Sequence, residues 1–278
     1  MLKTRVITAV FLFAAFFLAL FYLPPLGWLV FATAVATVAA WEWGGLMRLG
    51  GAARILLGVL LAITCSGISA LEPAAVGLAA ASPEEAWRLG AWFYLPAAVW
   101  WLLAVPIWLK RRWSLSNHGV GLMIGMLLIL PTWLALVQLR QAGPPALLAI
   151  MAVVWLADIG AYFTGRRFGK HKLAPNISPG KTWEGAVGGG VAVVAYGFLV
   201  SSKLPATLSD NYLLLLLIMI LLTVISVLGD LFESLLKRQA GLKDSSNVLP
   251  GHGGVLDRID SLTSTLPLVA LVWLATAH

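Results

Sequence analysis

Charged residues are scarce in this chain of 278 residues: they make up 11% of it, whereas hydrophobic residues make up 60%. Soluble domains carry about 25% charged residues. The mean hydropathy is +0.90, and several apolar runs reach the ~20 residues that a helix needs to cross a bilayer. These runs are rich in leucine and alanine, whereas the strands of a membrane barrel would alternate in polarity over ~10 residues. The composition therefore predicts an all-α, polytopic membrane protein with a single membrane domain.

Cysteine and histidine are scarce too, which argues against several kinds of chemistry. The one cysteine, Cys65, lies in an apolar run and has no partner for an internal disulfide, so we interpret it as a small core residue. No G-x-S-x-G segment of a serine hydrolase occurs. There is no soluble basic domain that would bind nucleic acid, although the net charge is +7. The four histidines lack the ligand spacing of a zinc site; they are His118, His171, His252 and His278.

Nine membrane spans are predicted from the apolar runs and from the charges, prolines and glycines between them. The first run follows a basic start, as in a signal peptide, but it leads directly into further apolar runs, so we interpret it as a retained span. We divide the domain into N-terminal spans (1–144) and a half that carries the polar motifs (145–278). The expected spans are 6–23, 27–46, 55–71, 90–109, 119–138, 145–163, 186–202, 211–230 and 261–277.

The basic residues indicate how these spans are oriented. If the N-terminus is cytoplasmic, all but three of the 19 Lys and Arg residues fall on the cytoplasmic side, as the positive-inside rule requires. The exceptions are Arg88, Arg140 and Lys203. Adding or removing one span in the middle would destroy this asymmetry. We therefore expect a cytoplasmic N-terminus and an external C-terminus.

Asp158 is the most unusual residue in the first of two polar stretches, both on the predicted cytoplasmic side. At ~1.5 Å per residue it lies about 20 Å along its span, within a ~30 Å hydrocarbon layer. A carboxylate at that depth should face the bundle interior, with a cation, a basic side chain or a water-filled cavity as its partner. A purely structural pair with a neighbouring helix is the alternative.

The segment Ser178-Pro-Gly-Lys-Thr-Trp-Glu follows in the same stretch. It lacks the G-x-x-x-x-G-K-[ST] spacing of a Walker loop. It still offers groups that bind phosphate: the charge of Lys181, the hydroxyls of Ser178 and Thr182, and the free N–H groups at the start of the next helix. Glu184 either complements the dipole of that helix or takes part in the site.

The second polar stretch, from Ser234 to Asp260, mixes basic residues with carboxylates at short spacing. Asp257 and Asp260 are three residues apart, so they share one face if a helix has begun there. Asp230, at the cytoplasmic end of the preceding span, is placed to join them. Carboxylates with water and substrate phosphates suit Mg²⁺, although a salt-bridge cluster around Arg258 would explain the same pattern.

This second stretch reads S-x-x-K-R-x-x-x-x-K-D-x-x-x-x-x-P-G-H-G-G-x-x-D-R-x-D and closely resembles the signature of phosphatidate cytidylyltransferases, also called CDP-diglyceride synthetases. The segments D-x-x-A-Y-F-x-G-R from Asp158 and S-P-x-K-T-W-E-G from Ser178 are also similar to that family. The resemblance covers the chain from about Trp155 onward, and the earlier spans match only in being hydrophobic. It implies transfer of the cytidylyl group of CTP to phosphatidate, which gives CDP-diacylglycerol and pyrophosphate.

The resemblance and the residue chemistry together assign roles. Mg²⁺ is the expected cofactor, with a second cation left open, and a homodimer in a bacterial inner membrane is expected. The metal ligands would be Asp230, Asp257 and Asp260, with Asp257 first, and these three would be catalytic together with Lys237 and Arg238. The substrates would be bound by Ser178, Lys181, Thr182, Ser234, Lys243, His252 and Arg258, supported by Asp158, Glu184 and Asp244.

Three other classes of protein compete with this interpretation. A CTP-dependent kinase of lipid alcohols, similar to dolichol or phytol kinases, would transfer the γ-phosphoryl group and release CDP. A CDP-alcohol phosphotransferase would need a D-G-x-x-A-R…G-x-x-x-D-x-x-x-D pattern, which is absent. An ion-coupled transporter would explain Asp158, but it would place ionisable residues in both membrane halves, and no internal repeat is visible. Clustering on one side favours an enzyme that meets soluble CTP.

Overall fold

The computed structural model describes residues 2–80 and 82–276, so His278 lies outside the described residues. Helices dominate the described residues, which confirms the predicted helical fold. In chain order the elements are α1 (Leu2–Tyr22), α2 (Pro25–Leu46), α3 (Gly51–Leu71), α4 (Pro83–Val99), η1 (Trp100–Ala104), α5 (Val105–Arg111), α6 (His118–Gln141), α7 (Pro144–Phe168), β1 (Lys172–Ala174), β2 (Ser178–Thr182), α8 (Trp183–Leu199), η2 (Ser201–Lys203), α9 (Ala206–Ser209), α10 (Tyr212–Ala240) and α11 (Leu256–Thr276).

Most of these helices are apolar enough to cross a membrane. Within the described residues, seven have the necessary length, and two shorter apolar helices, Val6–Tyr22 and Trp183–Leu199, accompany them. One long helix runs unbroken through α4, the short π-helical η1 and α5, so it extends beyond the predicted span 90–109 at both ends. Cys65 in α3 is fully buried, which confirms its interpretation as a core residue. The prediction of a polytopic helical membrane protein is also confirmed.

The helix α10 is longer than predicted. The expected span ended at residue 230, but the helix continues to Ala240. Its last turns still bury an apolar stripe on one side, so the helix persists although charges occupy the other side. Gly241, with a φ of 76°, then ends it in the left-handed conformation. The residues that lie on this helix instead of in a loop are Ser234, Lys237 and Arg238.

Strands β1 and β2 form an antiparallel hairpin that the all-α prediction missed. Lys172 pairs with Thr182, and Ala174 pairs with Ser178. The turn between them contains Pro and Asn, which both favour turns. The strands are too short to show the alternation of polar and apolar residues by which a strand is recognised in a sequence. The hairpin matters because β2 carries Lys181 and leads directly into α8.

Glycines allow the helices of the C-terminal half to approach closely. A Cβ atom on Gly189 in α8 would lie 2.6 Å from the carbonyl oxygen of Ala157 in α7. A Cβ atom on Gly229 in α10 would lie 2.9 Å from the carbonyl oxygen of Asp260 in α11. Small residues at such crossings are typical of membrane helix pairs. They let α8 approach α7 closely, and α10 approach α11.

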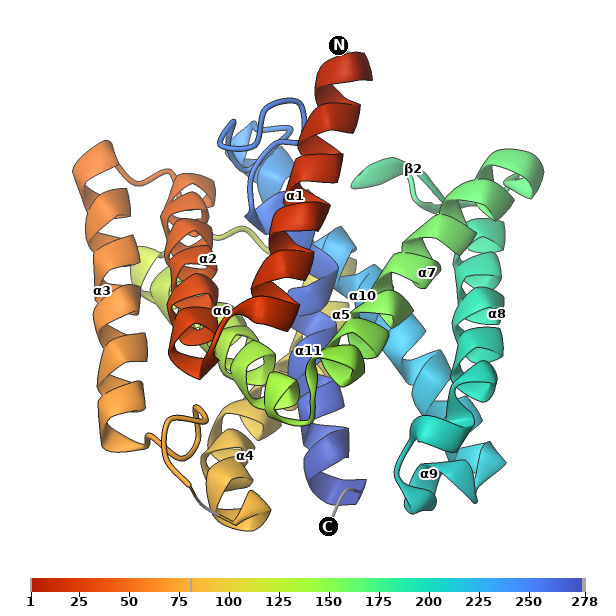
Figure 1. Cartoon of the computed structure of the whole chain (residues 1–278). Helices are drawn as coiled ribbons and strands as arrows, with labels where there is room; N and C mark the ends of the chain where they lie inside the picture. Colours follow the sequence, from red (N-terminus) through yellow and green to blue (C-terminus); the bar gives the residue numbers. More distant parts are fainter. Residues whose placement is uncertain (1, 81, 277–278) are drawn as a thin grey trace.

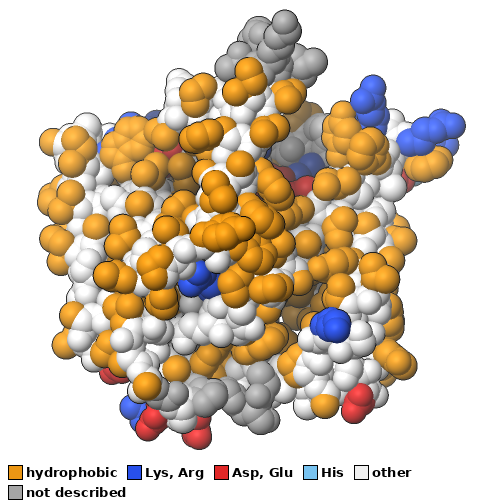
Figure 2. Space-filling model, viewed as in Figure 1, with side chains coloured by type: hydrophobic (Ala, Val, Ile, Leu, Met, Phe, Trp, Pro, Cys, Tyr) orange, Lys and Arg blue, Asp and Glu red, His pale blue; other side chains and the backbone are white. Residues whose placement is uncertain are grey.

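The two ends of the bundle differ in character. Figure 1 shows β2, the start of α1 and the loop of residues 241–255 at one end, and α9 and the C-terminus at the opposite end. We call residues 241–255 the signature loop. Figure 2 shows hydrophobic side chains spread across this face of the molecule from one end to the other, as expected for a surface in contact with lipid.

Candidate active site

A cavity of about 480 Å³ lies between α7, α8, α10 and the β1–β2 hairpin. Its lining includes Asp158 of α7, Lys181 of β2 and Asp230 of α10. Ser178 and Thr182 contribute further polar groups to the wall. The structure therefore brings the first polar stretch of the sequence together with the residue that precedes the second.

Lys181 and Asp230 form an ion pair in this cavity. The Nζ atom lies 2.5 Å from Oδ2, and the two side chains are 24% and 28% exposed. The other carboxylate oxygen accepts a hydrogen bond of 3.1 Å from the Ser234 hydroxyl, one turn further along α10. Asp158 is exposed in the same cavity. The cavity thus holds one lysine and two carboxylates in a space that a solute can enter. A phosphate that entered could replace the Asp230 carboxylate as the partner of the Lys181 ammonium group.

Thr182 and Glu184 hold the hairpin against α8. The buried Thr182 is the N-cap of that helix, where its hydroxyl oxygen accepts a hydrogen bond of 3.1 Å from the N–H of Gly185. Glu184 accepts a hydrogen bond of 3.2 Å from the N–H of His171, and its Oε1 lies 2.6 Å from Nδ1 of the same residue. Both side chains therefore position β2 and its lysine, Lys181.

A second ion pair, between Lys237 and Asp257, is buried more deeply. Its Nζ and Oδ1 atoms are 2.6 Å apart, and the side chains are 12% and 3% exposed. Glu233 lies 3.5 Å from the same Nζ atom. The other oxygen of Asp257 accepts hydrogen bonds from the N–H and hydroxyl of Ser245, at 2.8 and 3.0 Å, and from the N–H of Gly254 at 2.8 Å. Asp257 thus joins α10, α11 and the signature loop.

The signature loop requires glycine where it approaches α11. Gly253 has a φ of 82°, in the left-handed region that favours glycine. A Cβ atom there would lie 2.6 Å from Oδ2 of Asp257. The N–H of Leu249 donates to the carbonyl oxygen of Gly253 at 2.8 Å and closes a tight turn. His252 lies in this turn, and its buried Nδ1 has no hydrogen-bond partner among the described residues.

Helix α10 connects the two ion pairs. Its polar residues are spaced at i, i+3, i+4 and i+7, which places them on one face; they are Asp230, Glu233, Ser234 and Lys237. Because α11 begins at Leu256, Asp257 and Asp260 lie on a helix. This is the condition under which the two carboxylates were expected to share one face. The two polar stretches of the sequence therefore form one continuous polar region at this end of the bundle.

Four charged residues of the predicted site lie on the surface of the same end and do not line the cavity. One of them has a hydrogen bond: Nη1 of Arg238 lies 3.5 Å from the carbonyl oxygen of Leu242. All four are exposed; they are Arg238, Lys243, Asp244 and Arg258.

The carboxylates of this end are the groups that could hold a metal ion. Within the described residues, no three Asp, Glu, His or Cys side chains are grouped closely enough to bind one by themselves. Mg²⁺ usually takes one or two protein carboxylates, and water and substrate phosphates fill the other positions. Asp158 and Asp230 open onto the cavity and fit that requirement, whereas both oxygens of Asp257 are engaged by protein donors. Glu233 and Asp260 line a much smaller cavity nearby, and neither oxygen of Glu233 has a hydrogen-bond partner in the described part of the chain.

Two further residues of the cavity were not among those we predicted. Tyr162 and Arg166 of α7 line it, and Nη1 of the arginine lies 3.1 Å from the tyrosine hydroxyl. Both belong to the segment D-x-x-A-Y-F-x-G-R, so the signal was present in the sequence. They add a second cation to the wall of the cavity.

Glu42 in α2 is a third residue whose role we did not predict. It is fully buried. Its Oε1 accepts hydrogen bonds from the Ser246 hydroxyl at 2.6 Å and the Val255 N–H at 2.9 Å. Its Oε2 accepts from the Ser245 hydroxyl at 3.1 Å and the Leu256 N–H at 2.6 Å. One carboxylate of the N-terminal half thus fastens the signature loop and the start of α11, and a lone charge within a predicted span is the signal that could have indicated it.

Replacing Glu42 with alanine should loosen the signature loop. Four donors would lose their acceptor in a buried site, where each unmade hydrogen bond costs about 1–3 kcal/mol. We expect faster proteolysis within the loop, a lower melting temperature in detergent and a lower kcat. The exposed Glu84, at the start of α4, provides the matched control, Glu84→Ala. Proteolysis at the same rate in Glu42→Ala and wild type would contradict the proposed fastening of the loop.

The apolar bundle and the polar cavity at one of its ends define an integral membrane protein with a charged internal site. The chain belongs to the cytidylyltransferase family, since the sequence profile of that family matches residues 3–275. This match includes the N-terminal spans, which we had found similar only in hydrophobicity. The chain is therefore a nucleotidyltransferase, and the resemblance noted in its sequence is confirmed.

Individual relatives agree with the family assignment. The chain is 42% identical over 281 residues to the phosphatidate cytidylyltransferase of Pseudomonas aeruginosa, across 99% of this chain and 98% of the relative. It is 36% identical over 288 residues to the phosphatidate cytidylyltransferase of Haemophilus influenzae, across 96% of each chain. The protein of that name from Bacillus subtilis is 40% identical over 176 residues, across 62% of this chain and 64% of the relative.

Proposed function

We infer that this protein transfers the cytidylyl group of CTP to phosphatidate and forms CDP-diacylglycerol and pyrophosphate in phospholipid synthesis. The observation that carries this inference is the cavity in which Lys181, Asp230 and Asp158 meet. It lies in a chain of the cytidylyltransferase family, and two relatives that align over nearly its whole length carry the name of this activity.

The nucleophile of this reaction is the phosphate of the lipid. The second pKa of a phosphate monoester is near 6, so it is largely ionised at cytoplasmic pH. A lipid phosphate oxygen bonds to the α-phosphorus of CTP, and the bond from that phosphorus to the pyrophosphate oxygen breaks. No protein general base is required. The difficulty is to bring two polyanions together, so cations must screen their repulsion and stabilise the charge that develops during transfer.

The cations of the site are placed for that task. Lys181 stands in the cavity, oriented by Asp230, and Arg166 lines the same wall with Ser178. We assign the CTP phosphates to these groups. Lys237, held by Asp257, extends the positive charge along α10. The basic residues at the surface of this end would attract CTP from solution; they are Arg238, Lys243 and Arg258.

Mg²⁺ is the proposed cofactor. When bound, it would neutralise phosphate charge and act as a Lewis acid at the reacting phosphoryl group. Asp230 and Asp158 would hold it from the cavity wall, and Asp260 is the nearest further candidate on α11. Asp257, which we expected as the first ligand, would instead fix Lys237 and the signature loop.

We further propose nine membrane spans with a cytoplasmic N-terminus, in the inner membrane of a bacterium. Seven long and two shorter apolar helices among the described residues support the number, and the relatives compared are bacterial proteins. This orientation puts the cavity and the signature loop in contact with the cytoplasm, where CTP and Mg²⁺ are available. A homodimer is proposed from the family resemblance.

A product assay tests the proposed function. Purified protein in detergent, supplied with CTP, phosphatidate and Mg²⁺, should form pyrophosphate and CDP-diacylglycerol in equal amounts. A folded protein that released CDP from CTP and a lipid alcohol would instead be a lipid kinase. Folded protein that formed neither product would contradict the proposal.

A further inference from the structure

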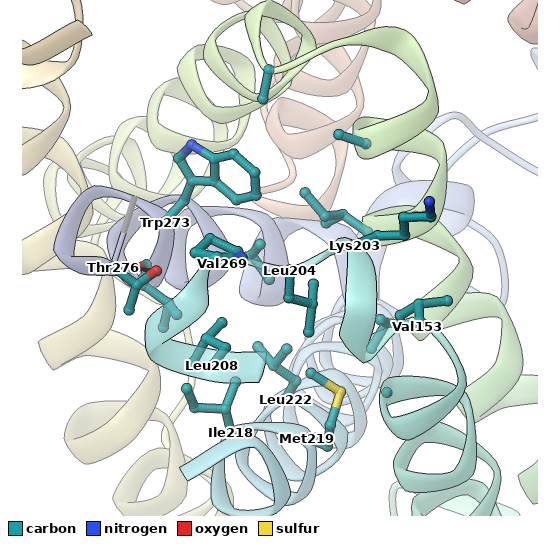
Figure 3. Close-up of a pocket in the computed structure, with 18 of the residues that line it drawn as sticks. Val153, Lys203, Leu204, Leu208, Ile218, Met219, Leu222, Val269, Trp273 and Thr276 are labelled. Carbon is teal, nitrogen blue, oxygen red and sulfur yellow. Dashed lines mark hydrogen bonds between the residues drawn. The ribbon is translucent and has the colours of Figure 1, made fainter. Parts of the chain in front are cut away.

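A second cavity (Figure 3) is lined by Leu208 of α9 and Thr276 of α11. Helix α9 and the C-terminal end of α11 lie at the end of the bundle opposite the candidate active site (Figure 1). This second cavity has a volume of about 500 Å³, within the ~300–1,000 Å³ range of ligand pockets, and we call it the apolar chamber. Figure 3 shows Val269 and Trp273 of α11 on one side of it and Met219 and Leu222 of α10 on the other. Among the described residues that line it, Lys203 alone is charged.

The lining determines what kind of molecule can occupy the chamber. Water is a poor occupant, because an apolar cavity offers it few hydrogen-bond partners. Empty space is also unfavourable, because the lining atoms would lose dispersion contacts on one side. Within a bilayer, the apolar material at hand is the acyl chains of lipids. An acyl chain is therefore the chemistry that fits the chamber.

The chamber and the active-site cavity are lined by neighbouring stretches of the same three helices, α7, α8 and α10. On α7, Val153 lines the chamber, and Ala157, one turn further along, lines the cavity. On α10, the neighbouring residues Leu222 and Thr223 line the chamber and the cavity respectively. One helical turn rises only ~5.4 Å. On α8, Val193 is fully buried between the two linings.

We propose that the apolar chamber binds one acyl chain of the phosphatidate whose phosphate reacts in the cavity. This inference rests on the proposed function. A phosphate beside Lys181 directs the rest of the lipid along α7, past Ala157 and toward the chamber. The chamber then follows α7 from Val153 to Ala146, about 10 Å of helix. A long acyl chain reaches into it, and a short one ends before it.

The chamber would therefore discriminate among lipids by chain length. Bilayer lipid is as apolar as the chamber lining, so entry of a chain is favoured by the fit of their surfaces and not by the hydrophobic effect. A competing occupant is a bystander lipid of the opposite leaflet, with its headgroup near Lys203. A bystander lipid would fill the chamber equally well with a long-chain or a short-chain substrate. Blocking the chamber would therefore change the preference for chain length only if the substrate's own acyl chain occupies it.

Filling the chamber with a side chain tests the proposal. Ala149 lines it on α7, so Ala149→Phe would place a ring where the chain lies. With dipalmitoyl and dioctanoyl phosphatidate as substrates, the ratio of kcat/KM for the long lipid to that for the short one should fall at least about tenfold. The matched control is Ala195→Phe, at an exposed position of α8 outside the chamber, which should keep the wild-type ratio.

A second pair of variants covers the case in which Ala149→Phe does not fold. Val200→Trp fills the chamber from the end of α8, and Leu199→Trp places the same ring on the exposed side, where Leu199 is 80% exposed. An unchanged ratio in the folded chamber variants, or an equal fall in the controls, would overturn the proposal and assign the chamber to bystander lipid. Wild-type protein that turned over neither lipid would instead refute the proposed function itself.

Discussion

Replacing Asp230 with asparagine should lower kcat/KM for cytidylyl transfer by about a thousandfold, the loss expected for one preorganised electrostatic group. Lys181 would lose the carboxylate that now lies 2.5 Å from its Nζ atom, and the cavity would lose one of its two candidate Mg²⁺ ligands. Asparagine has nearly the same shape and the site is partly open, so the fold should persist. Initial rates at varied CTP, together with thermal unfolding in detergent, measure both expectations.

Two comparisons show whether this loss arises in the site. Asp210→Asn makes the same change at an exposed position just before α10, at the opposite end of the bundle, and should leave the rates unchanged. If Lys181 and Asp230 act as a unit, Lys181→Met combined with Asp230→Asn should be no slower than the slower single variant. Activity of Asp230→Asn within a few-fold of wild type would contradict the assigned role.

Asp257→Asn should have the second largest effect, because it breaks the buried ion pair with Lys237. That pair is 12% and 3% exposed, and removing one partner of a buried pair costs about 3–5 kcal/mol. We expect a clear fall in melting temperature and a fall in turnover smaller than that of Asp230→Asn, while membrane insertion is retained. Thermal unfolding in detergent and the pyrophosphate assay measure the two effects.

Neutralising both partners distinguishes structural from catalytic roles. Glu233 also lies 3.5 Å from Nζ of Lys237, so the triple variant Lys237→Met, Asp257→Asn, Glu233→Gln is the one that leaves none of these three charges unpaired, and it should recover stability relative to Asp257→Asn alone. Its turnover should stay low, because the positive charge near the phosphates is gone. Recovery of both stability and turnover would show that the pair only supports the fold.

The helical membrane fold and the family could be predicted because they depend on local properties of the sequence. Long apolar runs identify membrane helices wherever they lie, and the signature from Ser234 to Asp260 has many specified positions at fixed spacing. The inclusion of Asp158 and Lys181 in one cavity with Asp230 needed only the expectation that both polar stretches occupy one end of the bundle.

The features that sequence did not reveal depend on tertiary contacts. The carboxylate of Glu42 accepts a hydrogen bond from Leu256, 214 residues away, and no local pattern indicates that pairing. The β1–β2 hairpin has too few residues to show a strand period. Which carboxylates face the cavity and which face the signature loop depends on helix rotation, so Asp257 could not be distinguished from Asp230 by spacing alone.

A structure determined with CTP and Mg²⁺ bound, in detergent or a lipid nanodisc, tests the central claim most directly. The account predicts the triphosphate in the cavity between α7, α8 and α10, with phosphate oxygens within hydrogen-bond distance of Lys181 and with Asp230 or Asp158 on the metal ion. A triphosphate bound outside this cavity, with Lys181 still paired to Asp230, would contradict it.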